Sequence, residues 1–206
     1  MSIKPIRFTT DEVRATLGGR KTVTRRVVRG AWPEWSYLGL TDDAAVTAVD
    51  RYGEEYPKPV DGLWAEFEDA DGPVEFPMVK TPYRPGDILY VRETWARMMN
   101  GDYWYKADGK DKTDIGLKIK WRPSIHMPRE AARIFLRVTD VRVERLQEID
   151  EKGAIAEGCS LCYPQGHFKS VWQHTIKPAD RERYGWEANP FCWVIEFEKC
   201  KKPEEG

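Results

Sequence analysis

The sequence has no long apolar run and few cysteines, and each scarcity excludes a class of protein. No stretch of the 206 residues approaches the roughly 18 uninterrupted apolar residues that a membrane-spanning helix needs, so we expect no membrane partner. Residues 1–7 contain no apolar run followed by small residues, and we therefore expect no signal peptide. Four cysteines do not make a disulfide framework in a chain of this size, and we expect a cytoplasmic protein.

A large net charge is also absent, because 33 Lys and Arg stand against 34 Asp and Glu. The distribution along the chain is uneven. Residues 1–30 carry eight bases and two acids, residues 31–80 carry three and twelve, and residues 81–146 carry fourteen and nine. This pattern excludes a uniformly basic nucleic-acid-binding protein but allows a basic face beside a separate acidic patch. Hydrophobic residues make up 41% of the chain, which is typical of a folded domain with a packed core.

Short β-branched or alternating segments, bounded by turn residues, predict more strands than helices. We expect strands at residues 3–8, 21–28, 88–91, 102–106, 134–143 and 193–197, the second of which also suits a tight loop. We expect helices at residues 12–17, 149–157 and 168–176, with Thr10 or Asp11 capping the first and Asp150 the second. The alternation shifts phase at Thr139-Asp140, which predicts a β-bulge. Many short strands with few helices favour a small barrel with peripheral helices.

Two hairpins are expected, one of them inside an insertion at about residues 30–80. That region is acidic and rich in Pro, Gly and Trp, and Asp71-Gly72 would turn residues 63–67 back onto residues 74–79. The second hairpin turns at Asn100-Gly101 and is followed by a long loop at residues 107–130.

The segment at residues 19–26 packs four cations and two hydroxyls into eight positions directly after a Gly-Gly helix stop. On a regular strand Lys21 and Thr24 would lie on opposite faces, so a site that used both would need a bend between them. Judged by residue types alone, the segment favours a basic edge strand whose charges prevent aggregation.

The spacing Gly19-x-Lys21-x-x-Thr24-x-Arg26 resembles the signature of the ASCH (activating signal cointegrator homology) domain, a family with a PUA-like β-barrel. Residues 85–89, 146–158 and 194–197 resemble the turn, helix and closing strand of that family. Residues 91–95 and 121–128 are similar to segments of the longer ASCH proteins of phages and prophages. The resemblance implies one α+β domain over residues 1–206, built on a PUA-like barrel.

Some small bacterial ASCH proteins are amidohydrolases that remove the acetyl group from N4-acetylcytidine, and the resemblance implies Lys21, Thr24 and Glu157 as catalytic residues. Thr24 Oγ would attack the acyl carbonyl, Lys21 would accept its proton, and Glu157 would protonate the departing amine. This chemistry needs no metal and no cofactor. A base of this kind is desolvated beside other cations, so we expect Lys21→Ala to leave the thermal midpoint nearly unchanged.

A basic cleft floored by residues 19–26 would hold the substrate, a modified nucleoside or a nucleic acid. We expect it to be lined by Arg20, Arg25, Arg26, Glu93, Arg122 and His126. For Glu93, pairing with an arginine on a neighbouring strand is an alternative of equal weight to a place in the cleft. For His126 the equal alternative is a structural hydrogen bond. Tyr103, Trp104 and Tyr105 have a capacity to stack on a base, although core packing is the favoured role for them.

Two other functions use the same residues. A non-catalytic RNA- or DNA-binding module would set Arg20, Arg25, Arg26, Arg122 and Arg129 against phosphates, and its binding would weaken steeply with salt. A ribonuclease on the same barrel would use the lysine and the glutamate as acid and base.

Cys159-x-x-Cys162 with His167 and Cys192 is the one candidate zinc set in the sequence. A second Cys-x-x-Cys pair is missing, so we expect no bound metal. The sequence leaves open the acyl group and the oligomeric state.

Overall fold

The computed structural model describes residues 2–31, 34–42, 45–49, 55–59, 62–68, 78–112 and 116–203, which form a mixed α+β protein dominated by strands. The strands are β1 (Ile3–Arg7), β2 (Val23–Val27), β3 (Ser36–Thr41), β4 (Ala45–Val49), β5 (Glu55–Pro59), β6 (Trp64–Glu68), β7 (Met78–Lys80), β8 (Ile88–Arg92), β9 (Trp95–Arg97), β10 (Tyr103–Tyr105), β11 (Phe135–Arg145) and β12 (Phe191–Cys200). The helices are α1 (Thr10–Leu17), α2 (Glu151–Ala156), α3 (Pro164–Thr175) and α4 (Arg181–Tyr184). Short 3₁₀ turns are η1 (Lys106–Asp108), η2 (Ser124–His126), η3 (Arg129–Ala131), η4 (Leu146–Glu148) and η5 (Pro178–Asp180).

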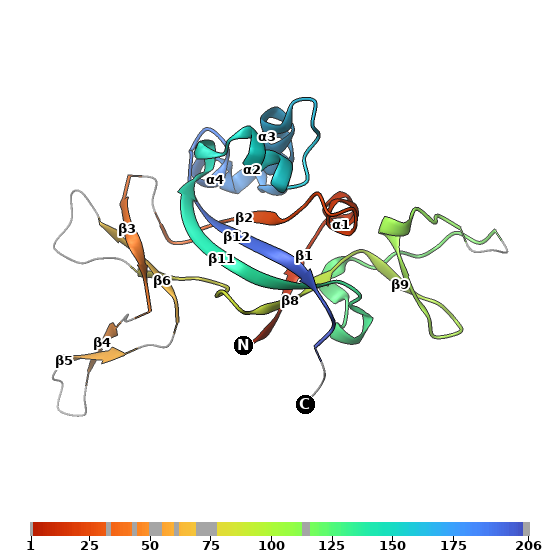
Figure 1. The fold of residues 1–206 in the computed structure, drawn as a ribbon, viewed down its shortest axis with the longest axis horizontal. Coiled ribbons are helices and arrows are strands. Elements are labelled where there is room, and N and C mark those ends of the chain that lie inside the picture. The colour runs from red at the N-terminus through yellow and green to blue at the C-terminus, as the bar shows by residue number, and fades with distance from the viewer. Residues whose placement is uncertain are drawn as a thin grey trace.

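The central sheet has the strand order β1-β8-β11-β12-β2, with β1 parallel to β8 and the other neighbours antiparallel. The long strands β11 and β12 curve across the middle of the molecule, and α2, α3 and α4 pack together on one side of them (Figure 1). The β11–β12 register shifts between Val138 and Asp140, which confirms the predicted bulge.

One face of the central sheet is buried, and it belongs to a core that includes Phe8, Leu136 and Ile195. The other face is buried only where the helices with Phe168 and Trp172 cover it, and further along it exposes charged residues such as Arg137 and Glu198. Burial of one such apolar side chain contributes roughly 1.5–3 kcal/mol, so these clusters hold the helices against the strands. The helices lie beside the first residues of β12, which explains why this strand starts as a continuous apolar run.

The two outer strands of this sheet, β1 and β2, are not joined by a backbone ladder in the described part of the chain. A side chain spans the gap, because Arg26 Nη2 donates to the main-chain oxygen of Arg7 at 3.2 Å. The predicted PUA-like barrel therefore stays a prediction, and the structure shows a curved five-stranded sheet.

Two small sheets, β3-β6-β7 and β4-β5, lie at the side of the central sheet (Figure 1). The first shares the main core, since Phe67 is fully buried and its ring lies 5.0 Å from that of Phe191. The pairing of β6 with β7 agrees with the hairpin expected there, while its turn at Asp71-Gly72 lies outside the described residues.

A second projection is the antiparallel hairpin of β9 and β10, which turns at Asn100-Gly101 as predicted. Gly101 has a φ of +90°, a conformation that glycine adopts without steric cost. The segment that follows, expected as a plain loop, contains the 3₁₀ turns η1, η2 and η3. No helix in the described ranges has the length and apolar character needed to cross a membrane.

Two helix starts differ from expectation. Thr9 caps α1, not Thr10 or Asp11, because Thr9 and Glu12 form a reciprocal capping box. Helix α3 begins at Pro164 and not at Phe168, since proline without its N–H fits the first helical turn. Asp150 caps α2 as predicted, accepting a hydrogen bond from the main-chain N–H of Gly153 at 2.6 Å.

Candidate functional site

Lys21 and Glu157, 136 positions apart, form a buried ion pair. Lys21 Nζ donates to Glu157 Oε2 at 2.6 Å and to the main-chain oxygen of Glu157 at 3.0 Å. Lys21 is 2% exposed and Glu157 8%. The geometry that the resemblance required, a glutamate after α2 lying against the lysine before β2, is present.

The backbone positions this pair. The main-chain N–H groups of Arg20 and Lys21 both donate to the oxygen of Ala15, which folds the chain back over the end of α1. Lys21 and Glu157 form an isolated β-bridge, and the N–H of Thr22 donates to the oxygen of Ala156 at 2.8 Å. Strand β2 consequently begins only at Val23, two residues later than expected, and Lys21 lies in the bend that a shared lysine and threonine site requires.

Gly158 allows α2 to end this close to Lys21. Its φ is +90°, and a Cβ added there would lie 2.7 Å from Ala15 Cβ and 3.2 Å from Lys21 Cβ. Glycine therefore satisfies both an unusual backbone conformation and a close approach. Any larger residue would push Glu157 away from the lysine.

The second carboxylate oxygen of Glu157 lies against β2 next to Thr24. Oε1 accepts a hydrogen bond from the main-chain N–H of Arg25 at 2.5 Å, so the carboxylate spans from Lys21 to the Thr24–Arg25 peptide. Thr24 pairs with Ile195 of β12 and is fully buried. Its Oγ1 has no hydrogen-bond partner among the described residues. A buried hydroxyl without a partner costs about 1–3 kcal/mol, which makes it a functional candidate.

Glu12 completes the cluster, and sequence reasoning missed it. Its Oε2 accepts the hydrogen bond from the Thr9 N–H at 2.8 Å, while Oε1 lies 3.4 Å from Lys21 Nζ and 4.0 Å from Arg26 Nη2. Burial raises the pKa of Glu12, but the charges of Lys21 and Arg26 and the bonds from Thr9 outweigh it and hold that pKa below 4.5. The capping-box spacing of Thr9 and Glu12 was the signal in the sequence.

Lys21 is thus surrounded by oxygen atoms, which bears on one expectation. Its ammonium group has three hydrogens, and three oxygens of Glu157 and Glu12 lie within 3.4 Å of Nζ. Removing the lysine would take the nearest cation from the buried Glu157 and leave only Arg25 Nη1, 3.7 Å from Oε1, which costs several kcal/mol. These contacts argue against the expectation that Lys21→Ala leaves stability unchanged, and we now expect that variant to lower the thermal midpoint.

The three neighbouring arginines differ in exposure. Arg25 is buried, and its Nη2 donates to Glu144 Oε2 at 2.8 Å, so this residue is not free to bind a phosphate. Arg26 is half-buried, and its guanidinium lies 6.0 Å from the Phe8 ring centre, on the same side as Lys21. Arg20 is exposed and donates to the main-chain oxygen of Gly158 at 3.3 Å. Arg26 and Arg20 are therefore the two that an incoming substrate can reach.

A hollow of about 420 Å³ adjoins β2, but it differs from the basic cleft that we expected. It is lined by Arg25 and, on the sheet and helix around it, by Val23, Arg142, Glu144, Glu148, Asp150, Lys152, Gly153, Ala156 and Glu196. Four carboxylates face three cations, and Lys21, Thr24 and Glu157 do not line it. The acidic lining follows from β11 and β12, whose Glu144 and Glu196 both accept bonds from Arg142.

Glu93, predicted near the site, has an arginine partner instead. It is 1% exposed, and Arg133 Nε and Nη2 donate to its two oxygens at 2.9 and 3.1 Å. Arg122 pairs with Trp95 through a β-bridge, and His126 is an exposed residue of η2. None of the contacts described for Glu93, Arg122 and His126 joins them to Lys21, Thr24 or Glu157.

Within the described residues no group of three or more His, Cys, Asp and Glu side chains has metal-binding geometry. His167 Nδ1 instead accepts a hydrogen bond from the Ser160 N–H at 2.9 Å, and burial raises the pKa of the Cys159 thiol to about 11. The comparisons add no assignment: the chain matches no protein family, no curated protein and no solved structure.

Proposed function

We propose that the protein is a metal-independent amidohydrolase that acts on an N-acylated nucleoside or base of the N4-acetylcytidine type, on an ASCH-like scaffold. One observation carries the proposal: a buried Lys21–Glu157 pair is fixed to the strand that presents the unpartnered hydroxyl of Thr24. Unsatisfied buried polar groups and buried charge pairs persist where function requires them.

The acylation step uses three side chains, which exchange protons among themselves and with the substrate. The proton between Lys21 Nζ and Glu157 Oε2, atoms 2.6 Å apart, passes to the carboxylate and leaves a neutral amine. That amine takes the proton of Thr24 Oγ1 as the oxygen attacks the acyl carbonyl. Protonated Glu157 then gives its proton to the exocyclic amine of the base as the amide bond breaks. The products of this step are the free base and a threonine ester.

The deacylation step reverses the proton path. Water attacks the ester, Glu157 accepts a proton from the water, and Lys21 returns its proton to Thr24 Oγ1 as the carboxylic acid leaves. Glu157 then passes its proton to Lys21, which restores the ion pair. Glu12 has a positioning role, because its Oε1 lies 3.4 Å from Nζ and holds the lysine between two carboxylates. The exposed part of Arg26 supplies a cation for the substrate.

The substrate must open this site, since Thr24 Oγ1 is not solvent-accessible. Arg26 and Glu12, 4.0 Å apart, are only half-buried, so the least protein covers the cluster on their side. Catalytic hydrogen bonds often assemble only in the substrate complex, so a closed free enzyme is compatible with catalysis.

The test is hydrolysis of a panel of N4-acylated cytidines by the wild-type chain, Thr24→Val and Thr22→Val. Valine keeps the β-branched shape in both variants, and Thr22 is an exposed residue two positions away. We expect Thr24→Val to lose at least about 10²-fold in kcat and Thr22→Val to retain it.

A wild-type chain that hydrolyses no member of the panel overturns the proposal. Full activity in Thr24→Val would overturn the nucleophile assignment and favour direct attack by water. A ribonuclease would instead degrade unmodified RNA and leave the acylated nucleosides intact.

A further inference from the structure

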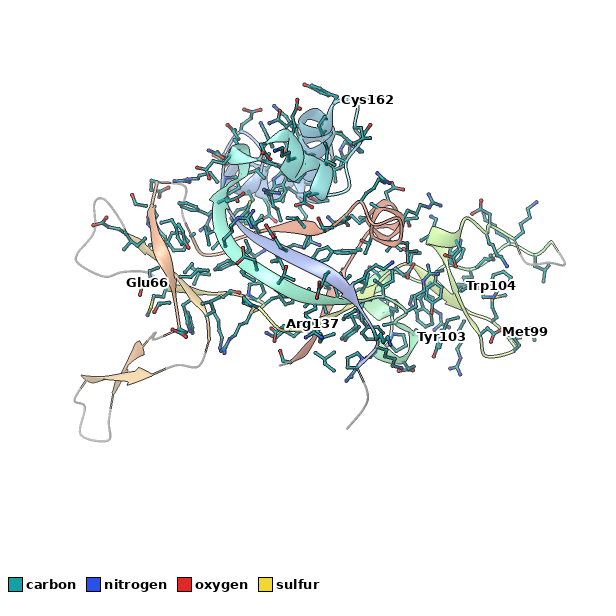
Figure 2. The ribbon with its side chains drawn as sticks, in the orientation of Figure 1. Glu66, Met99, Tyr103, Trp104, Arg137 and Cys162 are labelled. Carbon is teal, nitrogen blue, oxygen red and sulfur yellow. The ribbon has the colours of Figure 1, made fainter. Side chains whose placement is uncertain are left out.

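The β9–β10 hairpin and the chain that follows it place their cations over aromatic rings. Lys110 Nζ lies 4.4 Å from the Trp104 ring centre, the Arg97 guanidinium 6.0 Å from that of Tyr103, and the Arg122 guanidinium 5.2 Å from that of Trp95. We call residues 95–112 and 116–122 the arm. Trp104 and Met99 lie along its projecting part, away from the central sheet (Figure 2), whereas Tyr103 packs against the buried cluster that contains Ile88 and Phe135 of that sheet.

The arm is basic and its cations lack acidic partners. These residues include seven Lys and Arg against three Asp. All seven bases are exposed, and none forms an ion pair within the described ranges: Arg97, Lys106, Lys110, Lys112, Lys118, Lys120 and Arg122. On the central sheet, by contrast, cations are paired: the single side chain of Arg142 bonds to three carboxylates, those of Asp140, Glu144 and Glu196. The arm therefore presents positive charge that the protein itself does not neutralise.

Exposed cations alternating with half-buried rings match the chemistry of a single-stranded nucleic acid. Lysine and arginine neutralise phosphates, and tryptophan and tyrosine stack on unpaired bases. An acidic protein surface would satisfy the cations but would leave the rings without stacking partners. Trp104 is only partly buried, so its ring is reachable, whereas Tyr103 packs against the buried Trp95 with ring centres 5.7 Å apart.

The base of the arm adjoins the catalytic cluster. Arg14 of α1 donates from Nε to the main-chain oxygen of Ala107 at 2.9 Å, and the same helix holds Glu12 against Lys21. A strand bound along the arm would therefore be led to the helix that borders the site.

We propose that the arm binds single-stranded nucleic acid and thereby presents the acylated base to the site within a polymer. The second clause rests on the proposed function. The first stands without it, because binding is measured without turnover.

The binding test is fluorescence anisotropy with labelled oligo(rU) and oligo(dT) of about twelve nucleotides, which separates RNA from DNA as the source of the strand. We expect Trp104→Ala and Lys110→Ala to weaken binding by about tenfold, and Lys110→Ala to lower the salt slope by about one unit. Lys169→Ala is the matched control, because Lys169 also lies over a tryptophan, 5.5 Å from the Trp186 ring, but pairs with Glu187 at 2.8 Å. It should bind as the wild type does.

Wild-type binding in both arm variants, with unchanged thermal midpoints, would overturn the proposal. So would equal affinity for poly-glutamate, which would assign the arm to an acidic protein. The turnover test compares free N4-acetylcytidine with the same base inside an oligonucleotide. Slower hydrolysis of the oligonucleotide alone in Trp104→Ala supports presentation in a polymer, and equal slowing of both substrates overturns it. A wild type that hydrolyses neither overturns the proposed function, while the anisotropy still decides whether the arm binds nucleic acid.

Discussion

Two corners of the molecule bury a glutamate against a cation, and they use it differently. At the site corner the oxygens of Glu157 go to different groups, Lys21 Nζ and the Arg25 N–H. At the hairpin corner both oxygens of Glu93 go to one guanidinium, that of Arg133. The first carboxylate joins two segments, whereas the second is held by a single partner.

The two carboxylates also differ in whether every polar group around them has a partner. Arg133 also contacts Asp108 at 2.8 Å and lies 3.9 Å above the Tyr105 ring, so every part of the guanidinium packs or bonds. Beside Glu157 the Thr24 hydroxyl is left without a partner. The network around Glu93 is closed, while the hydroxyl beside Glu157 is the group that we propose for the reaction with a substrate.

The largest expected effect comes from breaking the pair at each corner. Lys21→Met removes the nearest cation from the buried Glu157 and leaves Arg25 Nη1 at 3.7 Å, and we expect a loss of about 3–5 kcal/mol in the free energy of unfolding together with loss of hydrolysis. Arg133→Met should cost less, because Arg133 is 27% exposed and water can solvate Glu93. Urea unfolding and acylcytidine turnover are the measurements, and Arg133→Met should remain active. Loss of turnover in a folded Arg133→Met would remove the distinction between the corners.

A smaller effect is expected at Gly158, where backbone strain and crowding coincide. Gly158→Ala should lose about 1–2 kcal/mol from its positive φ and a further 1–3 kcal/mol from overpacking against Ala15. Gly109→Ala is the control, since its φ is +78° and nothing lies within 4 Å of the added Cβ. It should show the strain alone. Equal thermal shifts in the two variants would mean that the close approach at Gly158 does not position Glu157.

The smallest effect is on the pH dependence of stability, to which Glu12 and Glu93 should contribute with opposite signs. The pKa of Glu12 is held below 4.5, so its stabilising contribution is present above pH 4.5 and is lost as the pH falls through the folded value. Burial raises the pKa of Glu93 above 4.5 despite Arg133, so protonation stabilises the folded state as the pH falls toward 4.5.

The measurement is the stability of wild type against Glu12→Gln and Glu93→Gln between pH 7 and about pH 4. The advantage of wild type over Glu12→Gln should shrink as the pH falls, and its advantage over Glu93→Gln should grow. Parallel curves for the two variants would show that the corners do not differ electrostatically.

Local signals in the sequence predicted local structure well. The alternation around Val138 located the bulge, Asn100-Gly101 located a hairpin, and Asp150 located a cap. The start of α1 was misassigned because Thr9, Thr10 and Asp11 are all good caps and only the reciprocal bond with Glu12 selects the first.

The site was predictable only in part. Spacing within residues 19–26 drew attention to Lys21 and Thr24, and the resemblance supplied Glu157. Periodicity carries no information on which segments meet, so it could not show that Glu12 faces Lys21 or that Arg133 pairs with Glu93. The acidic hollow beside β2 was missed for the same reason, since its carboxylates come from β11, β12, η4 and the residue that caps α2.

The position of β12 in the central sheet has a consequence for folding. Strand β2 has β12 as its ladder partner, and about 170 residues separate them, so β2 pairs only after the ribosome has released residues 191–200. Until then β2 and one edge of β11 are unpaired, and both can join strands of other chains. Closing so long a loop is slow, and the nascent chain spends that time with Thr24 and Val23 exposed. We expect assembly of the Lys21–Glu157 contact to be among the last steps of folding, and the chain to depend on chaperones until it is complete.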